Sequence, residues 1–411
     1  MREVFVLGVA MTPFGRLAQS CAELGRSAAQ DALADAGILV DDLDVVFYAN
    51  TMQGAIEGQF GMKGQHALLP LGIDGVPIVN VENACSGGTT AFHLAFAQVA
   101  GGLADVALAV GAEKLDSPER ARRQASFAQP ADLAQVSEFV ARHAALVADV
   151  RPPPGVVSDE SLRSPFMDAY ALNAKLHMKK YGTTWQQIAH VSAKNHKHST
   201  LNPLAQYQQD MTAQEVLAAR VIVWPLTLPM CAPISDGAAA AVVCSGEALR
   251  RFSPGRALRV CASVLKGNRR RALEAFESGA LREAAQAAYA QCDLRPQDIS
   301  FAELHDASAC AEIAQVELTG LCEMGAGGPF AASGATSLGG RVPVNVSGGL
   351  ESKGHPVAAT GLAQLFELAT QLRGEAGART VRDARYGLAV CVGGLFGVEE
   401  GIAAVTILGR R

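Results

Sequence analysis

Residues 81–95, VENACSGGTTAFHLA, place a single cysteine between two different patterns. The apolar residues before Cys85 indicate a short strand, and the two glycines after it allow a sharp turn into a small, apolar helix. A helix that begins here points its unpaired N–H groups and the positive end of its dipole toward the sulfur. We therefore expect this position to favour a thiolate and Cys85 to be a nucleophile. A buried cysteine that only fills a strand–helix junction is the alternative.

Residues 344–369, VNVSGGLESKGHPVAATGLAQLFELA, repeat this order of strand, small-residue turn and buried helix. His355 stands between Gly354 and Pro356 at the start of the second helix, where the helix dipole disfavours an imidazolium. A neutral imidazole there could accept a thiol proton or bond to an oxygen, and a purely structural histidine is the alternative. The repeat therefore predicts a base in the second half to match the nucleophile in the first.

Two further apolar segments end in reactive side chains. In AELHDASAC, the strand expected at residues 301–304 ends at His305, and in AVCVGGLFG a buried strand ends at Cys391. Strand ends are where α/β folds bind their ligands, although a surface His–Asp pair would also explain the first segment. Gly393, with the glycine after it, would let backbone N–H groups approach a substrate oxygen.

Strand-like and helical patterns alternate in two blocks of the chain, which indicates a layered α/β fold built from two similar halves. A stretch rich in Arg, Gln, Asp and Ser separates the two blocks and predicts an inserted loop domain. We expect the first half to comprise residues 1–115 and 221–250, the loop domain residues 116–220, and the second half residues 251–411.

Composition narrows the possible functions. The chain has 411 residues, of which 49% are hydrophobic, and a net charge of −5, without the basic face of a nucleic-acid binder. Its apolar runs are much shorter than the roughly 20 residues that cross a bilayer, and no secretion signal is apparent. The nine cysteines stand singly, without zinc-site spacing. We expect a cytoplasmic enzyme with reduced thiols, no bound metal, and no nucleic-acid or membrane partner.

The blocks VENACSGG, HDAS, GHPVAATG and CVGG, in this order, resemble the four signature blocks of the thiolase superfamily. The HDA block and CAPISDGAAAAVV at residues 231–243 are similar to the sterol-carrier-protein-type thiolases and their bacterial relatives. This resemblance implies the thiolase fold, in which two duplicated α/β halves form a five-layer αβαβα arrangement with an inserted loop domain.

The resemblance also implies a reaction and its residues. Cys85 would accept the acyl group, with His355 as its base, and Cys391 would exchange a proton with the α-carbon of the second acyl-CoA. His305 and His355 would hold the thioester oxygen, and the backbone N–H groups of Cys85 and Gly393 would form a second oxyanion hole. Coenzyme A would be a substrate, with no permanently bound cofactor. The expected reaction is cleavage of a 3-oxoacyl-CoA by CoA, or the reverse Claisen condensation.

Two alternatives remain open on the sequence. One is a biosynthetic C-acyltransferase of the same fold that acts on a non-CoA acceptor, although retention of Cys391 favours a thiolase. The other is a subunit that is active only with a small OB-fold, zinc-ribbon partner protein, as in bacterial proteins that this chain resembles. The resemblance further implies a homodimer or a dimer of dimers.

Overall fold

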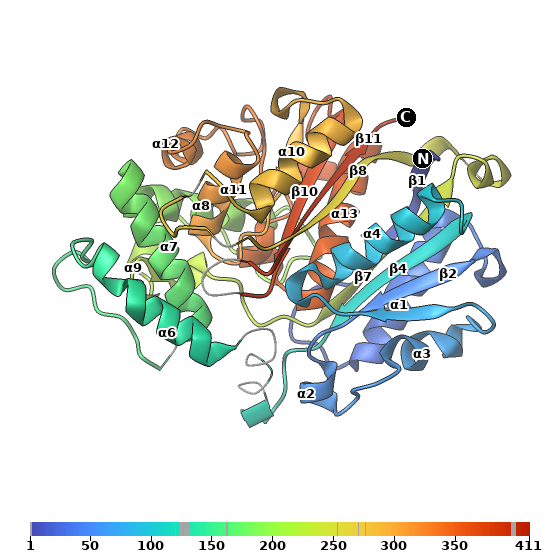
Figure 1. The fold of residues 1–411 in the computed structure, drawn as a ribbon, viewed down its shortest axis with the longest axis horizontal. Coiled ribbons are helices and arrows are strands. Elements are labelled where there is room, and N and C mark those ends of the chain that lie inside the picture. The colour runs from blue at the N-terminus through green and yellow to red at the C-terminus, as the bar shows by residue number, and fades with distance from the viewer. Residues whose placement is uncertain are drawn as a thin grey trace.

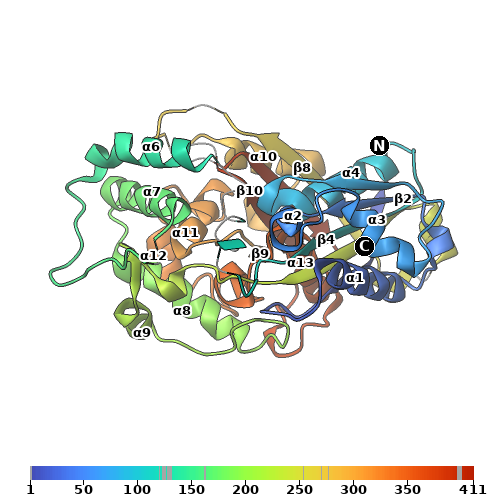
Figure 2. The same ribbon diagram turned by 90° about the horizontal axis from the view of Figure 1, so that it is seen from below.

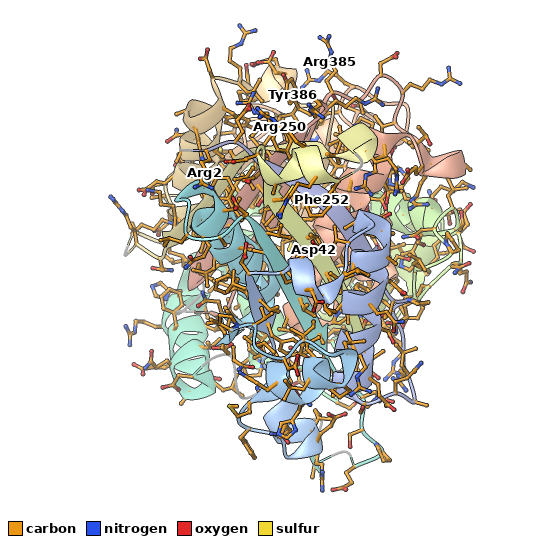
Figure 3. All side chains as sticks on the ribbon, turned by 90° about the vertical axis from the view of Figure 1, so that its right-hand side faces the viewer. Arg2, Asp42, Arg250, Phe252, Arg385 and Tyr386 are labelled. Atoms are coloured by element: carbon orange, nitrogen blue, oxygen red, sulfur yellow. The ribbon has the colours of Figure 1, made fainter. Side chains whose placement is uncertain are left out.

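The computed structural model describes residues 2–119, 121–122, 126, 132–161, 163–252, 254–269, 271–275, 277–395 and 400–411. Within these residues, no helix is both long enough and apolar enough to cross a membrane. Figure 1 shows the chain with its two ends at the same side of the molecule. Arg2, Arg250 and Arg385 lie at that side, where basic and acidic side chains are interspersed (Figure 3).

The first half of the fold is a five-stranded section of sheet with helices on both faces. Its strands lie in the order β3-β2-β4-β7-β1, in which β2, β3 and β4 are parallel and β7 is antiparallel to both of its neighbours. The elements of this half are β1 (Val4–Met11), α1 (Cys21–Ala36), β2 (Val45–Ala49), α2 (Gln53–Glu57), α3 (Lys63–Leu68), β3 (Ile78–Val81), α4 (Gly87–Ala100), β4 (Val106–Glu113) and β7 (Gly237–Ser245).

The second half repeats this plan with four strands in the order β8-β11-β10-β9. Here β9 and β10 are parallel, and β11 is antiparallel to both of its neighbours. The two halves join edge to edge where β1 pairs with β8 over two residue pairs. The elements are β8 (Leu258–Gly267), α10 (Ala280–Cys292), β9 (Phe301–Glu303), α11 (Ala309–Leu318), α12 (Gly327–Ala332), α13 (Thr360–Arg373), β10 (Tyr386–Gly393) and β11 (Ile402–Gly409).

The order of the strands confirms the duplication that the sequence predicts. Strands β1, β7, β4 and β2 correspond to β8, β11, β10 and β9, and the counterpart of β3 is the segment around Val344. That segment was expected to be a strand, but it forms only an isolated parallel bridge to Ala302. The turns that carry Cys85 and His355 follow β3 and this segment, so they occupy equivalent places in the two halves.

Helices and sheet sections stack in five layers. Helix α1 covers the outer face of the first half and α10 the outer face of the second, and each buries its own apolar cluster. Helices α4 and α13 lie side by side in the middle layer, packed with both sections of the sheet in one large core (Figure 1). Strand β7 (GAAAAVVCS) is buried along its whole length, because helices cover both of its faces.

Most of the described residues between β4 and β7 form a helical region beside the sheet. It contains α6 (Leu133–His143), α7 (Pro165–Tyr181), α8 (Trp185–Ser199), α9 (Ala213–Ala218) and the short strands β5 (Val221–Val223) and β6 (Leu226–Thr227). Helices α8 and α9 pack against α11 and α12 of the second half, so this region lies away from the strands of the first half (Figure 2). It therefore adjoins the end of the sheet at which β9 and β10 finish.

A close backbone contact aligns the two middle helices. The carbonyl oxygen of Ala358, in the turn before α13, would lie 2.4 Å from a Cβ at Gly88 and 2.3 Å from a Cβ at Gly111. Any side chain at either glycine would therefore push this turn away from α4 and β4. The turn after His355 and the helix after Cys85 can therefore touch only because Gly88 and Gly111 carry no side chain.

Candidate active site

Cys85 lies in a short 3₁₀ turn, Ala84–Ser86, that joins β3 to α4. Ala84 adopts a left-handed backbone conformation with a φ of 46°, and its N–H group donates to Oε1 of Glu82 at 2.7 Å. The buried hydroxyl of Ser86 donates to the carbonyl oxygen of Cys391 at 2.9 Å. These bonds fix the turn that carries Cys85 directly against the end of β10.

His355 stands in an extended segment just before the 3₁₀ turn Val357–Ala359 and helix α13. Its backbone N–H donates to Oγ of Ser235 at 3.0 Å, and its Nδ1 lies 2.7 Å from Oγ1 of Thr360. The Thr360 hydroxyl donates its own proton to the carbonyl oxygen of Pro356, so it accepts from Nδ1–H. We therefore assign the Nδ1–H tautomer, which leaves Nε2 as the basic nitrogen.

His305 follows β9, and its main chain is held on both sides by one glutamine. Gln315 accepts from the N–H of His305 and donates to its carbonyl oxygen, both at 2.8 Å. The imidazole is 1% exposed, and its Nδ1 lies 3.5 Å from Sγ of Cys391. The thiol of Cys391 also donates to the carbonyl oxygen of Cys85 at 3.1 Å.

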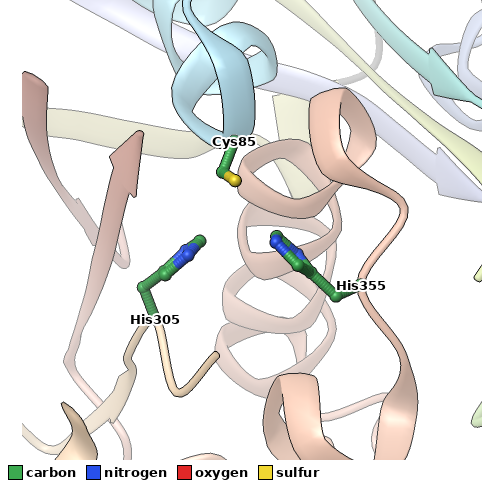
Figure 4. A group of neighbouring side chains, drawn as sticks. All are labelled: Cys85, His305 and His355. Carbon is green, nitrogen blue, oxygen red and sulfur yellow. The ribbon is translucent and has the colours of Figure 1, made fainter. Parts of the chain in front are cut away.

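The four predicted side chains meet at one place. The rings of His305 and His355 stand 5.0 Å apart at 87°, and the thiol of Cys85 faces the space between them (Figure 4). Cys85 and His355 are partly exposed, whereas His305 and Cys391 are buried. A ligand could therefore reach the first pair, and the second pair would form the floor of the site.

All four groups are neutral at pH 7. Burial raises the pKa of Cys85 above its ordinary value, helped by Cys391 and Glu113, and it raises the pKa of Cys391 to about 12. Burial also lowers the pKa of His355 to about 4 and that of His305 well below its usual range. The prediction that the helix start would favour a resting thiolate is therefore wrong, because desolvation outweighs the helix dipole. Nucleophilic attack by Cys85 would therefore require a base that removes its proton.

Backbone amides also approach the nucleophile. Hydrogen bonds from the backbone N–H groups of Gly394 and Cys85 oppose the rise in the pKa of the Cys85 thiol. At Gly393, a Cβ would lie 2.5 Å from the carbonyl oxygen of Asn83 and 2.7 Å from the nitrogen of Ser86, so only glycine fits there. The sequence indicated that both glycines let backbone N–H groups approach a substrate oxygen, and the resemblance assigned the oxyanion hole to Gly393; the geometry adds the Gly394 amide as a donor to the sulfur.

Sequence reasoning missed Glu113, at the end of β4. This carboxyl group is fully buried, and it accepts the N–H groups of Thr51, Met52 and Ala358 and the side-chain amide of Asn50. Burial raises the pKa of Glu113 to about 7, while the backbone hydrogen bonds oppose that rise. The only signal in the sequence was an acidic residue at the end of an apolar strand.

Among the described residues, Cys85, His305 and His355 form one group of metal-ligating types whose ligand atoms lie within 4.8 Å of one another. Their donor set, one thiol and two imidazoles, suits a soft divalent ion such as zinc. These are the same atoms that acyl transfer would use, and we assign no metal to them.

A cavity lies beside the site, between α7, the start of α10 and α11. About 80 Å³ of it is open to the centres of water-sized molecules, and its lining includes Tyr170, Cys310, Ala314 and Gln315. Gln315 is the residue that holds the main chain of His305. Cys85 lies near enough to Tyr170 to contribute to its raised pKa, after burial and Glu400. The cavity is therefore linked to the site through Gln315 and lies between the helical region and the second half of the fold.

Residues 4–218 match the family described as "Thiolase, N-terminal domain", and residues 266–410 match "Thiolase C-terminal domain-like". The chain belongs to the thiolase family. The two matched regions together contain all four of the predicted site residues. An acyltransferase of this family uses coenzyme A thioesters as substrates.

Several curated thiolase relatives are similar over most of their length. Sterol carrier protein 2 of Bos taurus is 37% identical over 400 residues, which cover 94% of this chain and 69% of that protein. Acetyl-CoA acetyltransferase of Methanothermobacter thermautotrophicus is 33% identical over 422 residues and the full length of both chains. Benzoylsuccinyl-CoA thiolase subunit BbsB of Thauera aromatica is 34% identical over 378 residues, covering 91% of this chain and 90% of that subunit.

One solved structure shares the fold over almost the whole chain. It is described as "Ltp2-ChsH2(DUF35) aldolase", and it aligns with a TM-score of 0.76 and 22% sequence identity. The alignment covers 99% of this chain and 98% of that chain. At 22% identity, this comparison establishes a shared fold and not a shared reaction.

Proposed function

We propose that this protein is a CoA-dependent thiolase, which cleaves a 3-oxoacyl-CoA with CoA or catalyses the reverse condensation through an acyl-cysteine intermediate. The observation that carries the proposal is the convergence of Cys85, His305, His355 and Cys391 from four separate segments of the chain. Two thiols and two neutral imidazoles at one place supply a nucleophile, its base and a second acid–base group.

In the first half-reaction, Nε2 of His355 takes the proton of Cys85 while the sulfur attacks the 3-oxo carbon. The N–H groups of Cys85 and Gly393 hold the resulting oxyanion, and the Gly394 amide is a further donor at this position. The carbon–carbon bond then breaks, leaving the acyl group on Cys85. The departing enolate takes a proton from Cys391, with its thioester oxygen held by His305 and His355.

In the second half-reaction, the thiol of CoA gives its proton to the thiolate of Cys391 and attacks the acyl-cysteine. Cys85 leaves as a thiolate and takes back the proton from His355. Every group thus returns to its starting state, and the products are two acyl-CoA molecules. The initially neutral histidine is essential to this cycle, because an imidazolium could not accept the first proton.

Intact-mass measurement tests this proposal. The protein is mixed with a 3-oxoacyl-CoA in the absence of free CoA, and we expect an acyl adduct that peptide mapping assigns to Cys85. Cys85→Ala should show no adduct and no thiolysis, whereas Cys391→Ala should still form the adduct by transfer from an acyl-CoA. Thiolysis by Cys85→Ala, or carbon–carbon cleavage by the wild type without an adduct, would contradict the mechanism.

We further propose that the acyl portion of the substrate enters the cavity beside Tyr170. Gln315, which lines the cavity, also holds the main chain of His305, and this connection supports the placement. About 80 Å³ of the cavity is open to the centres of water-sized molecules, several times the roughly 10–15 Å³ that one water needs, so it offers more room than an acetyl group requires. Chains longer than acetyl are therefore the expected substrates.

We propose that the enzyme is a homodimer joined through β3. This strand is the outer edge of the nine-stranded sheet, and Val79 at its centre is 44% exposed. An exposed sheet edge offers unpaired backbone groups to a second strand, which supports edge-to-edge pairing between two copies. A dimer of dimers would need a second surface in addition.

We also propose that a small OB-fold, zinc-ribbon protein assists this chain. The relative BbsB is named as a subunit, and the structural neighbour is described together with a DUF35 component. Activity of the purified chain, measured alone and with the product of a neighbouring gene, tests this point. Full activity of the chain alone would rule out an obligatory partner.

A cytoplasmic location is part of the same proposal. All nine cysteines are free thiols, a state that the reducing cytoplasm maintains. Fractionation of the native host with an antibody to the chain provides the measurement, and recovery from an oxidising compartment would contradict this location.

A further inference from the structure

A buried ion pair lies immediately behind the two histidines. Nζ of Lys353 is 3.5 Å from Oε2 of Glu303, and each side chain is 1% exposed. Glu303 also accepts hydrogen bonds from the backbone and side chain of Ser347. None of these groups belongs to the four-residue catalytic set.

The ion pair connects the two segments that carry the histidines. Glu303 is the last residue of β9 and stands two residues before His305. Lys353 ends a short π-helical turn, Gly349–Lys353, and stands two residues before His355. The bond between Glu303 and Lys353 therefore ties together two segments that are 50 residues apart in the sequence.

A second set of bonds joins the same two segments from the other side. The buried carboxyl group of Asp306, next to His305, accepts the N–H of Leu350 at 2.8 Å and that of Glu351 at 3.4 Å. Gly349 permits this approach, because a Cβ there would lie 2.1 Å from Oδ2 of Asp306. Bonds on both sides of His305 thus hold the turn that leads to His355.

The charge of Lys353 also reaches the reacting groups. It lowers the pKa of His355, after burial, and it opposes the rise that burial causes in the pKa of Cys391. The titratable groups around the pair are His355, Cys391 and, from α13, Glu367, whose charge raises the pKa of Glu303. The ammonium group therefore acts on the base and on the second thiol together.

Stability alone does not explain such a pair. Removing two charges from water costs several kcal/mol per ion, and apolar replacements of buried pairs are often neutral or stabilising. The pair moreover joins the two segments that carry His305 and His355.

We propose that Glu303 and Lys353 form a positioning pair, which fixes the separation of His305 and His355 and places a buried ammonium group behind His355 and Cys391. This inference rests on the proposed thiolase chemistry for its catalytic consequence. The positioning itself is a property of the unliganded site, so it can be measured without substrate.

Three variants test the pair: Lys353→Met, Glu303→Gln and the double variant that carries both. Each single change leaves one buried partner unmatched, so the melting temperature should fall. The double variant removes both charges and should recover much of that loss. Its kcat should nevertheless remain reduced by about 10²-fold, with KM within about twofold of the wild type, because misplaced catalytic groups slow the chemical step. A double variant with wild-type kcat would overturn the proposal.

Alkylation of Cys85 by iodoacetamide, without substrate, gives a second readout. We expect its rate at pH 8 to change at least threefold in the double variant, because the base and its surrounding charge have moved. An unchanged rate would overturn the proposal even if no thiolysis were found. A different result is also informative. If the wild type shows no thiolysis but the alkylation rate changes in the double variant, the proposed function is rejected and the positioning pair is retained.

Arg373→Met is the matched control. Arg373 is also a buried cation in an ion pair, with Asp35 at 2.8 Å, but it lies at the far end of α13. Thirteen residues of helix separate it from Thr360, which corresponds to about 20 Å. Its loss should lower the melting temperature and leave both kcat and the alkylation rate of Cys85 unchanged.

Discussion

The Cys85 thiol is protonated at rest, and this has a direct consequence for its reactivity. Burial raises the pKa of the thiol above its ordinary value of about 8.5. The alkylation rate by iodoacetamide should therefore rise about tenfold per pH unit from pH 7 to 9 without reaching a plateau. Mass spectrometry of the Cys85 peptide gives this rate. The same cysteine in urea should level off near its ordinary pKa, and a plateau below pH 8 in the folded protein would contradict the prediction.

The hydroxyl of Thr360 selects which nitrogen of His355 is basic. Thr360→Val keeps the shape of the side chain but removes the acceptor for Nδ1–H, so the ring can adopt the wrong tautomer. We expect kcat to fall by about 10- to 100-fold, part of what a general base contributes, with little change in KM. Steady-state kinetics measure both values.

Thr370→Val provides the comparison for this variant. Thr370 is also on α13, and its hydroxyl donates only to the carbonyl oxygen of Phe366 one turn earlier. Its replacement should leave kcat within about twofold of the wild type. Equal losses in both variants would show that the effect arises from the helix and not from the tautomer.

At the scale of elements, Glu113 joins β4, the loop after β2 and the turn after His355. All four of its partners donate hydrogen bonds, so Glu113→Gln must turn an amide N–H toward at least one other N–H. We expect a loss of about 1–3 kcal/mol in the free energy of unfolding, as for other unsatisfied buried groups. Urea denaturation measures this loss.

The same variant should alter how stability depends on pH. Burial raises the pKa of Glu113 to about 7, compared with about 4.3 in an unfolded chain. The folded protein therefore binds the extra proton between these values, and its stability falls as the pH rises through this range. Glu113→Gln should flatten that decline. An unchanged slope would mean that Glu113 is already ionised at pH 5.

The cavity at α11 gives a prediction about substrate length. Ala314→Phe would place a ring in the empty space beside Tyr170. We expect kcat/KM for long 3-oxoacyl-CoA substrates to fall at least tenfold, while acetoacetyl-CoA is affected less than twofold. Parallel thiolysis assays with a series of chain lengths measure this. An equal loss for all lengths would place the acyl group elsewhere.

Local patterns predicted most of the elements, because their apolar periods are strong. The apolar period around residues 21–36 predicts a helix, and helix α1 spans Cys21–Ala36. A similar pattern around residues 273–291 predicts another helix, but α10 begins only at Ala280, after Gly279 with a φ of 141°. Strand β11, Ile402–Gly409, was not predicted, although its apolar sequence is typical of a buried strand.

The sequence predicted the candidate site residues that belong to a recognisable motif. It did not predict residues that are linked to the site only through tertiary contacts. Cys85, His305, His355 and Cys391 each follow a recognisable strand or turn signal. Glu303, Lys353 and Glu113 acquire their roles from partners that lie 44 to 245 residues away. A pattern within one short segment of sequence cannot predict contacts between residues so far apart in the chain.

At the scale of the molecule, the edge strand β3 predicts the oligomeric state. We expect a mass of twice the 42.8 kDa chain by light scattering. Val79→Lys should give a monomer, because a charged side chain on an edge strand opposes pairing. Leu103→Lys is the control, since Leu103 is 78% exposed in the loop after α4. A dimer that survives Val79→Lys would mean that another surface joins the subunits.

The contact of the Ala358 carbonyl with Gly88 and Gly111 has a consequence for heat inactivation. The turn that follows the base and the helix that follows the nucleophile touch through their backbones, without a flexible side chain between them. Neither can shift alone, so no partly loosened state keeps one while displacing the other. Loss of catalytic alignment on warming should therefore coincide with cooperative melting of the whole central layer.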